Sequence, residues 1–155
     1  MLKRNLLFAS ALMVLASCGK DILFEQNNSI EDAKWSMNQP VRFSVNVQDT
    51  LSPYDFYINI RNNGDYGFNN LYLFLNTEFP NGQSVSDTLE CLLASSDGKW
   101  LGSGLGDIYS QSILLKKKVR FPAKGVYRFE MIQAMRTDPL IGISDTGIRI
   151  EKSKD

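Results

Sequence analysis

Apolar and polar residues alternate with a period of two along most of the chain after residue 40. The clearest segment is 41–47, in which Val41, Phe43, Val45 and Val47 alternate with polar residues. A period of two puts successive side chains on opposite faces of a β-strand, so one face of each such strand can be buried. Further segments of strand character span 54–61, 70–79, 85–94, 108–119, 126–133 and 147–151, and no long segment has the period of a helix. The chain is therefore predicted to be all-β.

Turn-forming residues separate these segments. The tetrapeptide 62–65 (Asn-Asn-Gly-Asp) follows the second segment, 80–82 (Pro-Asn-Gly) follows the third, and 95–98 follows the fourth. Asn and Gly tolerate the positive φ angles of tight turns, and Pro fixes the φ angle of a turn residue. About seven to eight strands joined by such turns predict an antiparallel β-sandwich, in which the apolar faces of two sheets form the core. A partly closed barrel is the alternative.

The first eighteen residues have the features of a lipoprotein signal peptide. Lys3 and Arg4 precede an apolar segment at 6–15, and Ala16 and Ser17 stand directly before Cys18. Small residues at such a point allow a peptidase to reach the backbone. The apolar segment is shorter than the ~20 residues that span a bilayer, which argues against a transmembrane helix. An ordinary signal peptide followed by a chance cysteine is the other alternative.

The chain is accordingly divided into three parts: a signal peptide at 1–17, a lipidated Cys18 with a tether and lead-in at 18–39, and a β-sandwich domain at 40–155. The polar segment 19–28 is interpreted as the tether, and Trp35 as an anchoring side chain in the lead-in. Two or three acyl chains on Cys18 are expected to hold the domain stably, because each buried methylene contributes about 0.8 kcal/mol. The membrane is therefore a predicted partner, bound through lipid.

Charge and composition exclude several function classes. The 17 basic residues equal the 17 acidic ones, and loss of Lys3 and Arg4 with the signal peptide leaves the chain slightly acidic. Such a chain is not expected to bind nucleic acid, and the short basic run at 116–118 is interpreted as a solvated strand end. Histidine is absent, which removes the usual Ser-His-Asp and Cys-His catalytic arrangements. Cys91 is expected to pack as a small hydrophobe, with a reactive thiol as the alternative.

The glycine-rich segment 98–107 is the most conspicuous loop, and its pattern matches neither phosphate-binding motif of nucleotide-binding proteins. Trp100 in this loop is either a core anchor or an exposed residue that stacks on a sugar or a partner chain. Tyr66, Phe68 and Tyr109 are further candidate contact residues, because aromatic anchors dominate interface energetics. No catalytic, cofactor-binding or metal-binding residue is predicted, since sequence alone cannot pair the acidic residues Asp87, Glu90, Asp107 and Asp145.

An ordered series of short motifs spans nearly the whole chain after Cys18. It comprises Arg61-Asn62, Asn69-Asn70-Leu71-Tyr72-Leu73, Pro80-Asn81-Gly82, Asp87-Thr88-Leu89, Gly98-Lys99-Trp100-Leu101-Gly102, Gly104, Gly106-Asp107, Tyr109, Ala134-Met135-Arg136 and the glycines and aliphatic residues of 140–150. In this order the motifs resemble the GldH family of gliding motility lipoproteins of the Bacteroidetes. Their order and co-occurrence carry the resemblance, which agrees with the lipoprotein start.

The resemblance implies a membrane-anchored accessory of the gliding apparatus and of the type IX secretion pathway linked to it, without known enzymatic activity. Other envelope proteins of that complex are the implied partners, and Cys18 is the one residue whose family role carries over. Gly19 after the cysteine favours the outer membrane, and the lack of an acidic cluster there favours its periplasmic face. The alternative function is a lipid-anchored glycan-binding module, in which Trp100, Tyr109 and Tyr66 stack on sugar rings.

Overall fold

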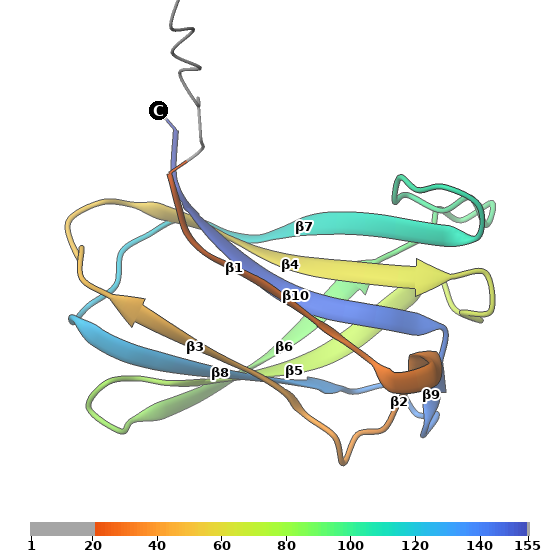
Figure 1. Ribbon diagram of the computed structural model, residues 1–155, viewed down its shortest axis with the longest axis horizontal. Coiled ribbons are helices and arrows are strands. Elements are labelled where there is room, and N and C mark those ends of the chain that lie inside the picture. Colours follow the sequence, from red (N-terminus) through yellow and green to blue (C-terminus); the bar gives the residue numbers. More distant parts are fainter. Residues whose placement is uncertain (1–20, 155) are drawn as a thin grey trace, which may run out of the picture.

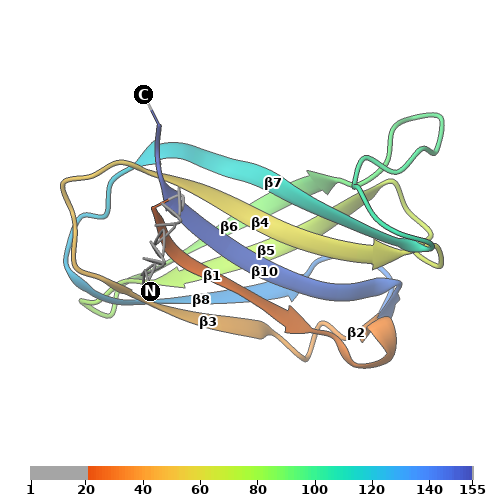
Figure 2. The same cartoon turned by 45° about the horizontal axis from the view of Figure 1, so that its top comes forward.

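The computed structural model describes residues 21–154 and confirms the predicted antiparallel β-sandwich. Two four-stranded sheets face each other (Figure 1, Figure 2), one in the order β1-β10-β4-β7 and the other in the order β3-β8-β5-β6. The strands of these sheets are β1 (Ile22–Ser29), β3 (Val41–Val47), β4 (Tyr54–Asn63), β5 (Asn70–Glu78), β6 (Ser84–Leu92), β7 (Ile108–Val119), β8 (Gly125–Gln133) and β10 (Ile143–Lys152). A short third sheet pairs β2 (Lys34–Trp35) with β9 (Leu140–Ile141).

The alternating segments supply the two apolar faces of the core. In β3, Phe43, Val45 and Val47 are buried while the polar residues between them are exposed. The two sheets meet where Phe56 of β4 packs on Phe129 of β8, with ring centroids 5.2 Å apart. Burial of each large apolar side chain contributes roughly 1.5–3 kcal/mol to folding, so these interleaved faces are the main source of stability.

The segment interpreted as a tether is in part a strand of the sandwich, which corrects the predicted boundary at residue 40. Strand β1 pairs antiparallel with β10 at the edge of the first sheet. An irregular register between Ile22 and Phe24 leaves the adjacent Leu23 and Phe24 both half-buried, which hides the period of two. The rest of β1 is mainly polar and exposed, and the backbone ladder with β10 holds it in place.

The lead-in closes one end of the core, as the anchoring role predicted for Trp35 requires. Its side chain is 1% exposed, and its indole Nε1 donates a hydrogen bond to the carbonyl of Gln39 at 3.1 Å. Strand β2 places it opposite the buried Leu140 of β9. Between residues 21 and 154 the one helix is η1 (Glu31–Ala33), and no helix in this range has the length and apolarity needed to cross a membrane.

The strand register separates two ends of the sandwich. At the first, the Asp21 end, Tyr54 of β4 lies opposite both Lys152 of β10 and Val119 of β7. The carbonyl of Asp21 accepts a hydrogen bond from the Lys152 amide there, at 2.9 Å. At the second, the aromatic end, Asn63 lies opposite Ile108. Strand β4 has ten residues, and at ~3.3 Å per residue it separates the two ends by about 30 Å.

Candidate functional site: an aromatic cluster

The four aromatic residues singled out from the sequence lie together at the aromatic end. The rings of Trp100 and Tyr109 pack with their centroids 5.5 Å apart and an interplanar angle of 31°. Tyr66 lies between Trp100 and Phe68, and its ring centroid is 6.4 Å from the first and 5.7 Å from the second. The rings come from three segments, namely loop 64–69, the glycine-rich loop and the start of β7. Pairing of β4 with β7 brings these segments to the same end of the sandwich.

Close backbone contacts fix the glycine-rich loop against the start of β7. A Cβ atom at Gly104 would lie 1.6 Å from the carbonyl oxygen of Ile108, so this approach requires glycine. Ser103 forms an isolated β-bridge with Ser110. Figure 1 shows the loop projecting at the end of the sandwich opposite the C-terminus. The glycines therefore serve chain packing, and they hold the loop where Trp100 reaches Tyr109.

Tyr66 is the buried support of the cluster, which corrects its expected role as a contact residue. Its side chain is only 3% exposed, and its hydroxyl donates a hydrogen bond to the carbonyl of Asn70 at 2.7 Å. Burial raises the pKa of this hydroxyl far above its usual value. The ring has no free face to offer to a sugar, so the glycan-binding alternative loses one of its three stacking residues.

Apolar side chains are exposed at the same end of the sandwich as this buried ring. Phe68 is 42% exposed, and Leu105 in the glycine-rich loop is 94% exposed. Leu101 and Ile108 at the same end are exposed as well. Exposed apolar side chains that gather in one region are typical of protein interaction surfaces. Sequence reasoning missed the leucines, although Leu105 stands between two glycines, where no strand partner can bury it.

A separate apolar cavity of about 210 Å³ opens between β6 and β7, the outer strands of the two sheets. Its lining includes Phe79, Val85, Leu115 and Phe121. Pockets that hold drug-sized ligands usually measure roughly 300–1,000 Å³, so this cavity is small for such a ligand. It is explained by the incomplete closure of two sheets along their edge strands.

Two of the four acidic residues considered for acid–base chemistry are engaged in ion pairs. Asp145 of β10 pairs with Arg61 of β4 at 2.9 Å, and Asp87 pairs with Lys116 at 3.1 Å. Burial raises the pKa of Asp145, and the charge of Arg61 opposes this effect. Across residues 21–154, no three Cys, Asp or Glu side chains form a group that could hold a metal ion. What the arrangement provides is apolar contact area at one end of a rigid sandwich.

Cys91 is a buried, unpaired cysteine of β6. Burial raises the pKa of its thiol to about 11, and the charge of Glu90 adds to this effect. A thiol with this pKa is almost fully protonated at neutral pH, so it packs as a small apolar group. The predicted role as a small hydrophobe is confirmed.

We expect Cys91 to be inert in the folded protein. In a mature chain carrying Cys18→Ser, Cys91 is the only thiol. At about pH 8 roughly 0.1% of a thiol with a pKa of about 11 is thiolate. A chromogenic disulfide reagent should therefore report no free thiol over an hour, and one thiol per chain after unfolding in guanidinium chloride. Complete reaction of the folded protein within minutes would contradict the burial of this side chain.

The sequence model of the GldH lipoprotein family matches residues 22–150, which is nearly the whole sandwich. The chain belongs to the GldH lipoprotein family. It is 37% identical over 154 residues to a gliding motility lipoprotein GldH homolog of Christiangramia forsetii, covering 95% of this chain and 94% of that protein. It is 35% identical over 158 residues to the gliding motility lipoprotein GldH of Flavobacterium johnsoniae, covering 97% of this chain and 98% of that protein.

Among solved structures, a fructofuranosidase variant of Schwanniomyces occidentalis matches with a TM-score of 0.40 and 12% identity. The match covers 88% of this chain and 35% of that one, and its low score carries no argument about function.

Membership of the GldH family makes this chain a lipoprotein of the gliding-motility type, anchored by lipid in the cell envelope. Cys18, the expected site of lipidation, lies outside the described residues. Three positions separate it from Asp21, the first described residue. Lipidation at Cys18, as predicted from the sequence, would attach the lipid near the Asp21 end, and the aromatic cluster lies at the other end.

Proposed function

We propose that this protein is a non-catalytic interaction component that supports gliding motility and the associated type IX secretion machinery. The proposal rests chiefly on the exposed apolar surface at the aromatic end, formed by Phe68, Leu101, Leu105 and Ile108. The buried ring of Tyr66 packs on Phe68 in this surface, which lies about 30 Å from the Asp21 end. A partner protein of the complex binds it.

The lipid on Cys18 places the protein at the outer membrane, on its periplasmic face. Gly19 and the nearly isolated acidic residue Asp21 support this sorting. Anchoring confines the domain to a thin layer, which raises its effective concentration beside partners held at the same membrane. A modest apolar surface then suffices for function, because the anchor supplies part of the apparent affinity.

The proposal predicts two independent ways to lose function in a deletion strain. Complementation with the wild-type gene should restore gliding, where the host glides, and type IX cargo in the medium. Cys18→Ala should leave a folded but mislocalised domain, because a protein without acyl chains leaves the membrane. Phe68→Ser combined with Leu105→Ser should leave a correctly anchored protein that restores less than a tenth of the secreted cargo, because the partner's apolar contact is lost.

Phe74→Ser is the matched control for the surface variant. Phe74 is 43% exposed and Phe68 is 42% exposed, but Phe74 lies on β5, outside the proposed surface. Cargo and protein level in this strain should equal those of the wild type. Full restoration of secretion by a soluble periplasmic form would overturn the anchored role. Equal defects from the Phe68 and Phe74 variants would overturn the assignment of the partner surface.

A further inference from the structure

The Asp21 end carries an excess of positive charge. Strand register and turns bring the end of β7, the turn between β7 and β8, the turn 48–53 and the C-terminal segment to this end. Seven exposed basic side chains lie on these segments: Lys116, Lys117, Lys118, Arg120, Lys124, Lys152 and Lys154. Five acidic residues share this end: Asp21, Asp49, Asp55, Asp87 and Glu151. The excess of two positive charges contrasts with the slight negative charge of the chain after loss of its signal peptide.

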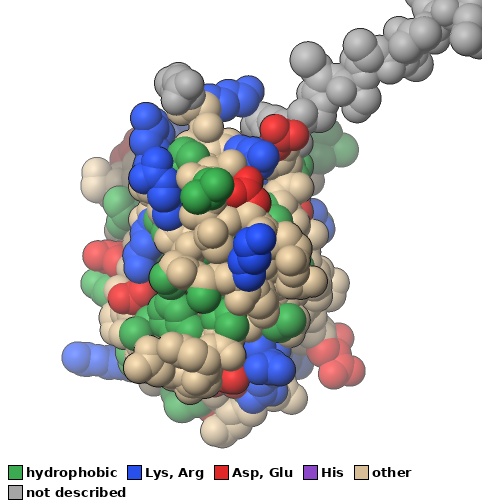
Figure 3. Space-filling view, turned by 90° about the vertical axis from the view of Figure 1, so that its left-hand side faces the viewer, with side chains coloured by type: hydrophobic (Ala, Val, Ile, Leu, Met, Phe, Trp, Pro, Cys, Tyr) green, Lys and Arg blue, Asp and Glu red, His purple; other side chains and the backbone are tan. Residues whose placement is uncertain are grey.

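Most of these basic groups are free to meet another charged surface. Lys116 pairs with Asp87 at 3.1 Å, and Lys152 pairs with Asp49 at 3.6 Å. Among the described residues, the other five basic side chains take part in no ion pair. Figure 3 looks at this end and shows Lys and Arg side chains over its upper part, with hydrophobic side chains gathered below them.

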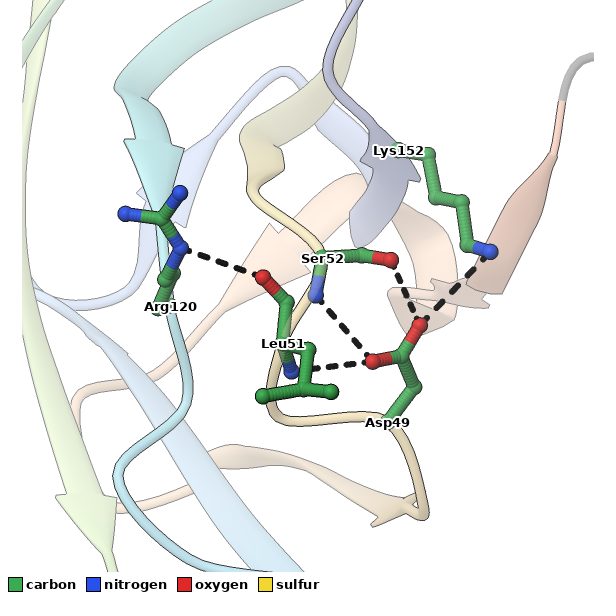
Figure 4. A network of polar contacts seen from close by, with 5 residues as sticks. All are labelled: Asp49, Leu51, Ser52, Arg120 and Lys152. Carbon is green, nitrogen blue, oxygen red and sulfur yellow. Dashed lines mark hydrogen bonds and ion pairs between the residues drawn. The ribbon is translucent and has the colours of Figure 1, made fainter.

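A highly exposed apolar side chain lies among these charges. Leu51, in the turn between β3 and β4, is 85% exposed. The carboxylate of Asp49 accepts hydrogen bonds from the backbone amides of Leu51 at 2.9 Å and Ser52 at 3.1 Å (Figure 4). It also accepts the Ser52 hydroxyl at 2.6 Å, the strongest of the contacts that hold the pKa of Asp49 far below its usual value.

Arg120 fixes the same turn from the other side. Its guanidinium Nε donates a hydrogen bond to the carbonyl of Leu51 at 3.1 Å, so a cation lies directly beside the exposed leucine (Figure 4). Lys152, which approaches Asp49, flanks the turn on the opposite side. The backbone of Leu51 is therefore held at both its amide and its carbonyl, while its side chain contacts solvent.

This end also lies next to the lipid anchor. The Asp21 carbonyl accepts the Lys152 amide at 2.9 Å, which fixes the start of the described chain beside the turn. Three residues from Cys18 to Asp21 span at most about 11 Å. A domain tethered this closely keeps its Asp21 end within reach of the membrane surface, where the electrostatic attraction of basic residues acts over about a Debye length.

We propose that the Asp21 end is a docking face for a phospholipid surface that contains anionic headgroups. The basic side chains contact the phosphates, and Leu51 enters the boundary between headgroups and acyl chains. An exposed apolar residue ringed by Lys and Arg is the pattern of proteins that lie on a membrane interface. The inference rests on the lipid anchor of the proposed function and adds an orientation: the aromatic end points away from the membrane, toward partners.

Vesicle sedimentation tests this proposal with the mature chain carrying Cys18→Ser, so that acyl chains do not contribute. We expect binding to phosphatidylcholine vesicles with about a third phosphatidylglycerol, and little binding to pure phosphatidylcholine, at low salt where screening is weak. The triple variant K117Q, K124Q and K154Q removes three of the unpaired positive charges and should weaken binding roughly 100-fold, at about 5-fold per charge. Leu51→Ser should weaken it about tenfold, because part of a leucine's transfer free energy is lost.

Matched controls come from the aromatic end. Leu105 is 94% exposed but lies far from the basic residues of the Asp21 end, so Leu105→Ser should leave vesicle binding unchanged. The triple variant K34Q, K99Q and R136Q removes the same charge from elsewhere and should change binding less than twofold. Thermal unfolding of each variant verifies that it is folded.

Binding that ignores lipid charge, equal losses in the two triple variants, or no binding to either vesicle would each overturn the docking face. If this end binds a protein receptor instead of lipid, the protein would bind neither kind of vesicle. The assay uses purified protein without acyl chains, so its failure leaves the strain results for Cys18 and Phe68 standing. Failure of those strain experiments would equally leave the vesicle result standing.

Discussion

Trp35→Ala is expected to lower the free energy of unfolding by about 4 kcal/mol, because truncation of a fully buried aromatic side chain typically costs 3–5 kcal/mol. Trp35 is 1% exposed and closes the core opposite Leu140. The truncation removes its packing and leaves the carbonyl of Gln39 without its indole donor. Urea unfolding measures this loss as a lower midpoint at an unchanged slope. If the wild type has a typical stability, the variant would retain a free energy of unfolding of only a few kcal/mol.

Trp35→Phe separates packing from hydrogen bonding. Phenylalanine keeps most of the apolar volume but cannot donate to the Gln39 carbonyl. Its expected cost is about 1–2 kcal/mol, the usual effect of losing one buried hydrogen-bond partner together with a small loss of volume. If Trp35→Ala costs less than about 1 kcal/mol, the lead-in does not seal the core and belongs to a mobile tether after all.

Gly142→Ala is expected to cost about 4 kcal/mol and to disturb the aromatic cluster. Gly142 has a φ angle of 96°, a conformation that L-residues adopt only at a cost of roughly 1–3 kcal/mol. A Cβ atom there would lie 2.4 Å from the backbone nitrogen of Tyr66, which is far inside van der Waals contact. Relief of this clash moves loop 64–69, and overpacking of this kind typically costs a further 1–3 kcal/mol. Urea unfolding measures the loss of stability. Near-ultraviolet circular dichroism, which reports the packing of aromatic side chains, measures the disturbance of the cluster.

Gly64→Ala is the control for the same loop. No heavy atom lies within 4 Å of a Cβ atom at Gly64, and its φ angle lies outside the left-handed region. Its replacement should change the free energy of unfolding by less than about 0.5 kcal/mol, as for most unconstrained surface positions. Equal costs at Gly142 and Gly64 would show that the close approach to Tyr66 does not constrain the fold.

Most strands of the two main sheets could be predicted from the sequence alone. The expected segments 41–47 and 108–119 coincide with β3 and β7, and 54–61 falls within β4. These strands bury one face each, so their side chains must alternate in polarity, and the alternation is visible in any local window. The Pro80 to Gly82 turn is equally local, because Gly82 takes the positive φ angle that such a turn requires.

Strand β1 could not be predicted in the same way, because local polarity does not record its pairing. Its residues are mostly exposed and polar, and β10, far along the chain, supplies the hydrogen bonds that order it. The beginning of β10 was also missed: the structure starts it at Ile143, before the predicted segment 147–151. Ile143 is buried by its neighbours in the fold and belongs to no clear alternating segment.

The candidate site shows the same division. The sequence identified Trp100, Tyr66, Phe68 and Tyr109 by residue type, but it did not show that the four rings form one cluster. It also did not distinguish the buried Tyr66 from the exposed Phe68, since both stand in the same loop. Burial of Tyr66 depends on the close approach of Gly142 to its backbone. Gly142 is distant in sequence, so no local pattern records this contact.

The sequence by itself determined the all-β class, the strand and turn segments with strong local patterns, and the family to which the chain belongs. These properties depend on residues close together in the chain or on the order of motifs along it. The tertiary structure alone decided that β1 is part of the sandwich and that the basic residues and Leu51 gather at the Asp21 end. It also decided that the exposed apolar surface lies at the opposite end. The physical reason is that long-range backbone pairing sets which segments become neighbours, and this pairing depends on the whole core rather than on any local pattern.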